Sequence, residues 1–384
     1  MLAANIDDYR IRARRRLPRM FFDYLDGGSF GEVTLRRNRS DFDAITIEQR
    51  ILRDVAVRDH EATFLGRNWS APLMLAPLGF CGMFSHRGEI KAARAAERAG
   101  IPFCLSTMSI TGLAEVAGAV SERPIFQSYV FRDRDLSLEM LDTAQRLGAP
   151  TLVLTVDANV SGIRERDTRN GFRTATRLGP RALADLALHP RWCLQMAPGG
   201  VPQLGNIAGR KDYGHGVMAQ ASRLSAQIDP SLTWKDVAWL RQQWKGRLVV
   251  KGILSVPDAR EAVMAGADAI VVSNHGGRQL DGACSSLASL PPIVKAIEGE
   301  AEILLDSGIR RGSDVFKALA LGADAVLLGR AYAYGLAADG ERGVAGVIRL
   351  IRSELDITMA LSGVHSLAEL RADGPSILRH NFAS

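Results

Sequence analysis

The sequence has few cysteines and no long apolar run. Only four cysteines occur among 384 residues, and none stands at the spacing of a disulfide framework or a metal site. We therefore expect reduced thiols and no bound metal. No apolar stretch approaches the length that spans a bilayer. The N-terminal MLAANIDDYRIRARRR also lacks the apolar core of a signal peptide, so the protein is expected in the cytoplasm or on a membrane that it does not cross.

The charge of the chain favours anionic partners. The formal net charge is +6, and no basic run interleaved with aromatic residues appears, so nucleic acid is not an expected partner. An anionic substrate, an anionic cofactor and an acidic membrane surface all remain compatible with this charge. The composition, 47% hydrophobic and 23% charged, is that of a globular protein.

Eight short apolar runs, most of them followed by a helical pattern, predict the fold. Continuous apolar runs are typical of parallel strands that are covered on both faces. Eight strand–helix units predict an α/β fold, a (β/α)8 TIM barrel. An open doubly wound sheet is the alternative, but no GxGxxG follows the first run. The runs are PLMLAP (72–77), PFCLSTM (102–108), PIFQSYV (124–130), TLVLTVD (151–157), RLVVKGI (247–253), AIVVSNH (269–275), EILLDSG (302–308) and AVLLGRA (325–331).

Three parts of the chain lie outside this eightfold pattern. We expect one domain over residues 1–384, with a helical lead-in at 1–70 and a C-terminal tail at 371–384. The connection after the fourth strand, 158–230, is too long for a simple loop. Its central part, 171–226, is predicted to be an insertion or lid.

Polar residues end seven of the eight predicted strands. In a TIM barrel, catalytic groups stand at the C-terminal strand ends, and an apolar strand has no structural need for them. These strand-end residues are Ser106, Thr107, Gln127, Tyr129, Thr155, Asp157, Lys251, Ser273, Asn274, His275, Asp306 and, in the eighth run, Arg330. We expect them to line one site.

Two of these strand ends carry Gly–Arg patterns that suit a phosphate. Glycine backbone and a helix N-terminus attract phosphate, and arginine adds charge-assisted hydrogen bonds. The residues are Gly308, Arg310, Gly329 and Arg330. The nearby SNHGGRQLDG (273–282) places His275 as a candidate base and Arg278 as a candidate clamp for a carboxylate.

SNHGGRQLDG resembles the active-site signature of the FMN-dependent 2-hydroxy-acid dehydrogenases and oxidases. RLPRMFFDYLDGG, LAPLGFCGMF, FQSYV, LTVDANVSGIRERDTRNGF and DSGIRRGSDVFKALALGADAVLLGR resemble further blocks of that family, in the same order. The resemblance runs from about residue 6 to about residue 370. It implies oxidation of an (S)-2-hydroxy acid, lactate-like or mandelate-like, to the 2-keto acid, with FMN as cofactor.

The resemblance also implies a role for each site residue. His275 would be the base and Asp157 its partner. Tyr24, Arg164 and Arg278 would hold the substrate carboxylate, and Tyr129 the substrate oxygen. Lys251 would stabilise the reduced flavin. The remaining cofactor residues would be Pro77, Leu78, Gly79, Ser106, Gln127, Thr155, Ser273, Asp306, Gly308, Arg310, Gly329 and Arg330.

Four positions depart from the family pattern. Asn159 stands where Pro is common, and Met108 and Ser161 stand where other substrate-facing groups are common. These departures leave the choice of 2-hydroxy acid open. Gly79, where oxidases tend to have Ala, favours a dehydrogenase.

In the insertion, LHPRW (188–192) and PQLGN (202–206) resemble the mandelate and lactate dehydrogenase type, which docks on the inner face of the cell membrane and passes electrons to quinone. Trp192 with nearby leucines, among arginines that include Arg173 and Arg177, predicts a membrane-docking segment. A lid over the active site is the alternative. The resemblance further implies a homotetramer.

Three other functions stay open. An oxygen-using oxidase of the same family is the first alternative. A phosphosugar isomerase or lyase on the same barrel would be colourless. A non-catalytic sensor of a phosphate ligand would leave Lys251, His275 and Arg278 without a shared purpose.

Overall fold

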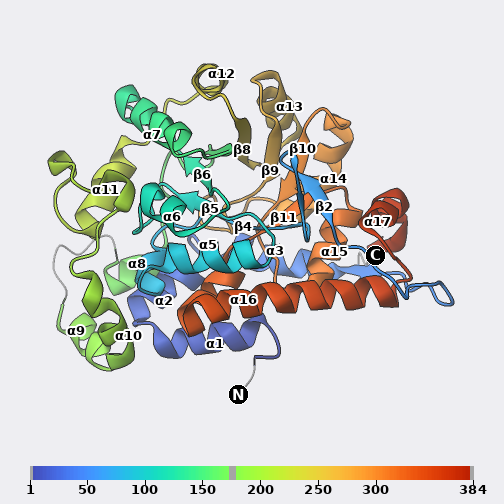
Figure 1. Cartoon of the computed structure of the whole chain (residues 1–384), viewed down its shortest axis with the longest axis horizontal. Helices are drawn as coiled ribbons and strands as arrows, with labels where there is room; N and C mark the ends of the chain where they lie inside the picture. The colour runs from blue at the N-terminus through green and yellow to red at the C-terminus, as the bar shows by residue number, and fades with distance from the viewer. Residues whose placement is uncertain (1–2, 173–178, 381–384) are drawn as a thin grey trace.

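Eight parallel strands form the centre of the computed structural model, which describes residues 3–172 and 179–380 (Figure 1). Hydrogen bonds join them in the order β4-β11-β10-β9-β8-β7-β6-β5, and a parallel bridge between Leu75 and Phe103 links β4 to the segment of β5. This arrangement confirms the predicted (β/α)8 barrel. The strands are β4 (Leu73–Leu75), β5 (Cys104–Ser106), β6 (Ile125–Ser128), β7 (Thr151–Thr155), β8 (Arg247–Ile253), β9 (Ala269–Val272), β10 (Glu302–Leu305) and β11 (Ala325–Leu328).

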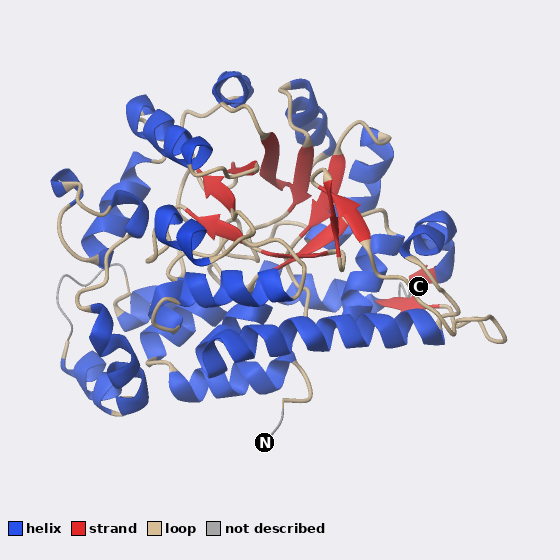
Figure 2. Cartoon of the chain, viewed as in Figure 1, coloured by secondary structure: helices blue, strands red, loops and turns tan. Residues whose placement is uncertain are grey.

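A helix follows each strand and covers the outside of the barrel (Figure 2). Almost every strand residue is buried, which is why the sequence shows continuous apolar runs. The helices are α5 (Gly88–Arg98), α6 (Leu113–Ala119), α7 (Arg134–Arg146), α12 (Trp234–Gln243), α13 (Val256–Met264), α14 (Ser286–Ile297), α15 (Gly312–Ala320) and α16 (Arg330–Leu361). The last is two helical stretches, because Asp339 and Gly340 have non-helical backbone angles.

The N-terminal lead-in packs along α16, and its first strand pairs with the C-terminal segment. Tyr9 lies so close to α16 that a Cβ at Gly346 would stand 2.0 Å from its hydroxyl. The elements are α1 (Ile6–Arg16), α2 (Arg19–Asp26), α3 (Val33–Ala44), β1 (Ile45–Ile47), β2 (Ala62–Phe64) and β3 (Arg67–Trp69), and the short α4 (Cys81–Phe84) follows β4. The C-terminal segment contains α17 (Leu367–Asp373), η4 (Gly374–Ile377) and β12 (Leu378–His380), and β12 pairs antiparallel with β1.

The insertion after β7 is helical and lies at one side of the barrel (Figure 1). Arg173 and Arg177 lie outside the described residues. Within the described parts, no helix is both long and apolar enough to cross a bilayer. The insertion comprises α8 (Glu165–Asn170), α9 (Pro180–Ala187), α10 (Pro190–Met196), η1 (Ala197–Gly199), η2 (Gly205–Ile207), η3 (Lys211–Tyr213) and α11 (Val217–Gln227).

The expectation that Trp192 enters a membrane interface is wrong in this structure. Its side chain is buried, its ring stacks on Phe21 with centroids 5.0 Å apart, and its indole N–H donates to the carbonyl of Met83 at 2.9 Å. Trp192 therefore holds α10 against the protein itself. The apolar side chains that α9, α10 and their connection expose to solvent are instead Leu183, Leu188 and Leu194.

Candidate active site

One cavity at the C-terminal ends of the barrel strands collects the predicted site residues. Its lining includes all of the candidate catalytic, substrate and cofactor residues except Asp157 and Ser273. These two stand directly behind lining residues and hydrogen-bond to them. The roles of the individual residues remain predictions at this point.

The pair formed by His275 and Asp157 is built by unusual backbone at the end of β9. His275 has a φ of 58°, and the two glycines after it continue in the left-handed region, which turns the imidazole back toward the end of β7. The Nδ1 atom of His275 lies 2.9 Å from Oδ1 of Asp157. This contact leaves Nε2 for the cavity. A neutral imidazole held in this way can accept a proton at Nε2.

Asp157 is kept ionised by its surroundings. Burial, the largest influence, would raise the pKa of Asp157, but the interaction with His275, including its hydrogen bond, and the charge of Lys251 outweigh burial and lower that pKa below its ordinary value. The other carboxylate oxygen, Oδ2, is buried without a hydrogen-bond partner among the described residues. Gly252 makes room for this side chain, because a Cβ at Gly252 would lie 2.6 Å from the Cβ of Asp157. Gly252 also has a φ of 114°, at the irregularity where β8 shifts register against β9.

Lys251 provides a buried positive charge in the wall of the cavity. Its Nζ lies 2.9 Å from Oδ2 of Asp306 and donates to the hydroxyl of Ser273 at 2.8 Å. Burial would lower the pKa of Lys251, but the carboxylates of Asp306 and Asp157 outweigh burial and raise it. Lys251 therefore stays an ammonium ion. The ion pair with Asp306 joins the ends of β8 and β10, which are separated by β9 in the sheet. The sequence did not predict this pair.

Two arginines lie against one tyrosine ring. The guanidinium carbon of Arg278 lies 4.6 Å from the ring centroid of Tyr24, and that of Arg164 lies 5.6 Å from it. Arg164 pairs with Asp167 at 2.8 Å, whereas Arg278 has no carboxylate within ion-pair distance among the described residues. Burial and then the charge of Arg164 lower the pKa of Arg278 to about 9. An anionic ligand would relieve this repulsion, so the arrangement suits a carboxylate.

The other end of the cavity fits a phosphate. A Cβ at Gly329 would meet no atom of the described residues within 4 Å, so the backbone that begins α16 is open to a ligand. Arg310 and Arg330 both line the cavity beside it. Together with the ammonium of Lys251, these groups fit FMN, whose phosphate and ring both require positive charge.

Several lining residues were not predicted. Phe80 and Phe84 lie in the predicted LGFCGMF block, but no pattern within it marks them as site residues. Ser225 and Ile228 come from the end of the insertion, and no local pattern marks them. The full set is Leu25, Ala76, Phe80, Phe84, Ala158, Ser225, Ile228, Gly276, Gln279, Ser307, Ile309 and Leu327. Ser273, expected to bond the flavin, lies behind Lys251 instead.

Known proteins resemble the whole chain in sequence and in structure. The profile of the FMN-dependent dehydrogenases matches residues 13–378. An L-lactate dehydrogenase of Xanthomonas oryzae pv. oryzae (strain PXO99A) is 47% identical over 98% of this chain and 97% of its own length. The crystal structure of the monotopic membrane protein (S)-mandelate dehydrogenase superposes with a TM-score of 0.95 at 41% identity, covering 99% of this chain and 100% of that one. A mandelate oxidase with (S)-4-hydroxymandelic acid gives a TM-score of 0.83 at 38% identity, over 96% of this chain and 98% of that one.

Proposed function

Because the chain belongs to the family of FMN-dependent dehydrogenases and is a 2-hydroxy-acid oxidoreductase, we propose that it oxidises an (S)-2-hydroxy acid with an apolar side chain. The observation that carries this proposal is the His275–Asp157 pair in the same cavity as the two arginines on Tyr24. His275 can accept a proton, and Arg164 and Arg278 can hold a carboxylate. A 2-hydroxy acid has both features on adjacent carbons.

The residues of the cavity have different roles in the proposed reaction. FMN, held beside Lys251, would supply an acceptor for the two electrons and for one of the two protons that the substrate loses. Arg278 and Arg164 hold the carboxylate, Tyr24 supports it, and Tyr129 binds the substrate oxygen. His275 takes the proton at Nε2, and the ionised Asp157 stabilises the imidazolium that results.

The walls of the cavity favour an apolar substituent on the substrate. Phe80, Phe84, Met108 and Ile228 line the cavity together with the small side chain of Ser161. Such a lining suits a methyl or an aryl group better than a charged one. Two of the similar proteins are named for lactate and for mandelate. We propose both as substrates to be compared.

Anaerobic flavin bleaching tests the substrate proposal. The purified holoenzyme should be yellow and release FMN on denaturation. Under nitrogen, (S)-lactate, (S)-mandelate and longer 2-hydroxy acids should bleach the flavin absorbance, while the (R)-enantiomers and the matching alcohols without a carboxylate should not. Bleaching by the neutral alcohols as readily as by the acids would contradict the assignment of Arg278 and Arg164.

We further propose that the enzyme docks on the inner face of the cell membrane and passes its electrons to quinone. The solved (S)-mandelate dehydrogenase is described as a monotopic membrane protein. In this chain Leu188 and Leu194 are 79% and 75% exposed, beside the exposed Arg181 and Arg191. Apolar side chains flanked by arginine suit an anionic interface. A lid that covers only the active site is the competing role, and the burial of Trp192 favours it.

Vesicle co-sedimentation separates docking from a lid. Replacing Leu188 and Leu194 with Ser should release the enzyme from anionic vesicles and lower quinone-linked turnover, while flavin reduction by substrate continues. The matched control replaces Ile357 and Leu361 with Ser, because they are also exposed but lie at the far end of α16 (Figure 1). If the wild-type enzyme stays in the supernatant at low salt, the segment does not dock on the membrane and its role is that of a lid.

Two further points of the proposal have direct measurements. Reoxidation of the reduced flavin by dissolved oxygen at the rate of turnover would identify an oxidase rather than a quinone-linked dehydrogenase. We also propose a homotetramer, and light scattering on the purified enzyme measures that assembly.

A further inference from the structure

One helix end holds two of the arginines that line the cavity, Arg278 and Arg330. Arg278 donates to the carbonyls of Tyr24 at 2.5 Å and Gly27 at 3.1 Å. Arg330 donates to the carbonyls of Leu25 at 3.0 Å and Gly27 at 2.7 Å. The last carbonyls of a helix lack partners within it and carry partial negative charge, so they attract guanidinium groups. The position of the C-terminal end of α2 therefore sets the direction of both side chains.

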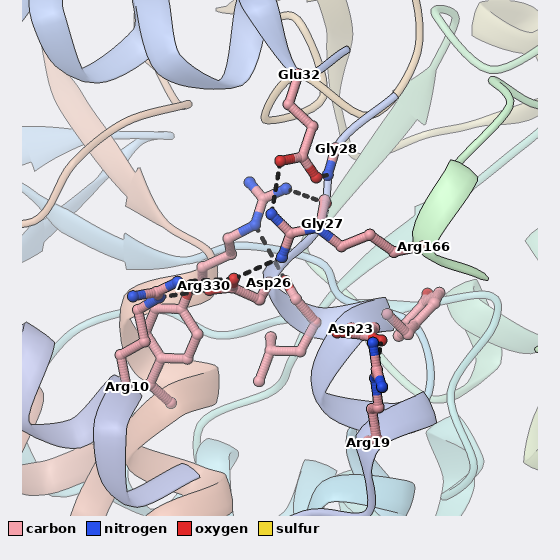
Figure 3. A network of polar contacts seen from close by, with 12 residues as sticks. Arg10, Arg19, Asp23, Asp26, Gly27, Gly28, Glu32, Arg166 and Arg330 are labelled. Carbon is pink, nitrogen blue, oxygen red and sulfur yellow. Dashed lines mark hydrogen bonds and ion pairs between the residues drawn. The ribbon is translucent and has the colours of Figure 1, made fainter. Parts of the chain in front are cut away.

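Asp26 lies in this helix end but does not line the cavity. Its carboxylate accepts hydrogen bonds from Arg10 at 2.6 and 2.9 Å, from the hydroxyl of Tyr334 at 2.7 Å and from Arg166 at 2.9 Å (Figure 3). The side chain is only 5% exposed. Burial would raise the pKa of Asp26, but these donors outweigh burial and hold the pKa well below its ordinary value. Asp26 thus fastens the end of α2 to α1, α8 and α16.

The contact with Arg166 extends this network toward the substrate. Arg166 belongs to α8, two residues after Arg164, and its other nitrogen donates to Glu32 at 2.6 Å. Glu32 in turn accepts from the backbone N–H of Gly28 at 3.0 Å (Figure 3). Asp26 and Glu32 therefore fix the start of α8, and with it Arg164, against the turn that follows Tyr24.

We propose that Asp26 is a positioning residue for the substrate carboxylate. Acting through the backbone of α2 and through Arg166, it brings Arg278, Arg164 and the ring of Tyr24 into one arrangement. The inference rests on the proposed assignment of the two arginines to the carboxylate. Among the described residues, the side chains of His275 and Asp157 form no hydrogen bond or ion pair with Asp26 or Arg166, although Arg330 also donates to the carbonyl of Gly276, next to His275, at 2.8 Å.

Asp26→Asn should therefore weaken binding of the carboxylate selectively. The amide cannot accept all four hydrogen bonds, and it carries no charge to balance Arg10 and Arg166. A misplacement of about 1 Å can cost roughly 100-fold in an enzyme site. We expect the Kd of a 2-keto acid to rise about 10- to 100-fold, while the Kd of its uncharged methyl ester changes by less than about threefold.

The test is a titration of the flavin spectrum of the holoenzyme with pyruvate and benzoylformate, and with their methyl esters. Asp23→Asn is the matched control, because Asp23 lies on the same helix and pairs with Arg19 at 3.4 Å (Figure 3). Its carboxylate also accepts from the amide of Asn170 in α8 at 3.1 Å, a hydrogen bond that asparagine can still accept. The control should bind acids and esters as the wild type does. Arg166→Gln, which leaves Asp26 paired with Arg10, should show the same preference with a smaller loss.

Each outcome decides the inference. Equal weakening of acid and ester in Asp26→Asn would show a general structural role and overturn it, as would wild-type affinity for both. If Asp26→Asn does not retain FMN, the Arg166→Gln titration decides by the same comparison. If no 2-hydroxy acid bleaches the flavin of the wild type, the proposed substrate is wrong, and this inference, which rests on that substrate, is wrong as well. Bleaching that is normal in the wild type, with no acid-selective loss in the variants, overturns only the role of Asp26.

Discussion

Asp157→Asn separates the charge of Asp157 from its shape. Oδ1 lies 2.9 Å from Nδ1 of His275, and asparagine keeps an oxygen acceptor there, so the ring should keep its orientation and tautomer. A hydrogen bond to a charged group contributes about 1.5–3 kcal/mol. Each 1.36 kcal/mol is about tenfold in rate. If His275 becomes an imidazolium as it takes the proton, loss of this charge should slow flavin reduction about 10- to 160-fold.

Anaerobic stopped-flow reduction at saturating 2-hydroxy acid measures this effect. The 2-keto acid should bind to Asp157→Asn within about twofold of its wild-type affinity, because the arginines are untouched. His275→Gln is the reference, and it should lose about 1000-fold, since the base itself is gone. A wild-type rate in Asp157→Asn would refute the role of the charge. A loss as large as that of His275→Gln would refute the idea that Asp157 only stabilises its partner.

Three other changes have defined outcomes. Arg278→Met should raise the Kd of the 2-keto acid about 100-fold, because truncating one member of a buried charge pair costs about 2–5 kcal/mol; flavin titration measures it. Gly79→Ala would place a Cβ 3.0 Å from that of Met108, so it should raise the KM for an aryl 2-hydroxy acid more than that for lactate. Because the pKa of Asp26 in the folded protein lies below its ordinary value, the ionised carboxylate stabilises the fold at pH values above the ordinary carboxyl pKa. This stabilisation is lost as the pH falls. Below about pH 4 the Tm of the wild type should therefore drop toward that of Asp26→Asn.

The barrel could be predicted because its strands are buried on both faces. That burial requires continuous apolar sequence, so all eight runs contain strands of the structure. The order of the strands then follows from alternation with helices. Helix α14 shows the limit of such local rules. It continues through Pro291 and Pro292, where lost backbone hydrogen bonds argue against a helix, because Leu290, Ile293 and Ile297 are buried in the core.

The sequence predicted which residues form the candidate site better than it predicted the contacts between them. Strand-end polarity and the family resemblance together named almost all of the polar groups that the cavity gathers. The pairing of Lys251 with Asp306 and the hydrogen bonds from Arg330 to α2 were not predictable from local patterns, since they join segments far apart in the chain. The same reason explains Trp192. An amphipathic helix exposes or buries its aromatic residue according to what lies beside it, and here Phe21 lies beside it.

The pairing of the first barrel strand with the last has a consequence for synthesis of the protein. β4 leaves the ribosome early, but its partner β11 follows only after all the other barrel strands, and β1 waits still longer for β12. A nascent chain therefore carries unpaired strand edges through most of its translation, and such edges pair readily with other chains. A chain that stops before Val326 would leave β4 without its neighbour and should accumulate as aggregate.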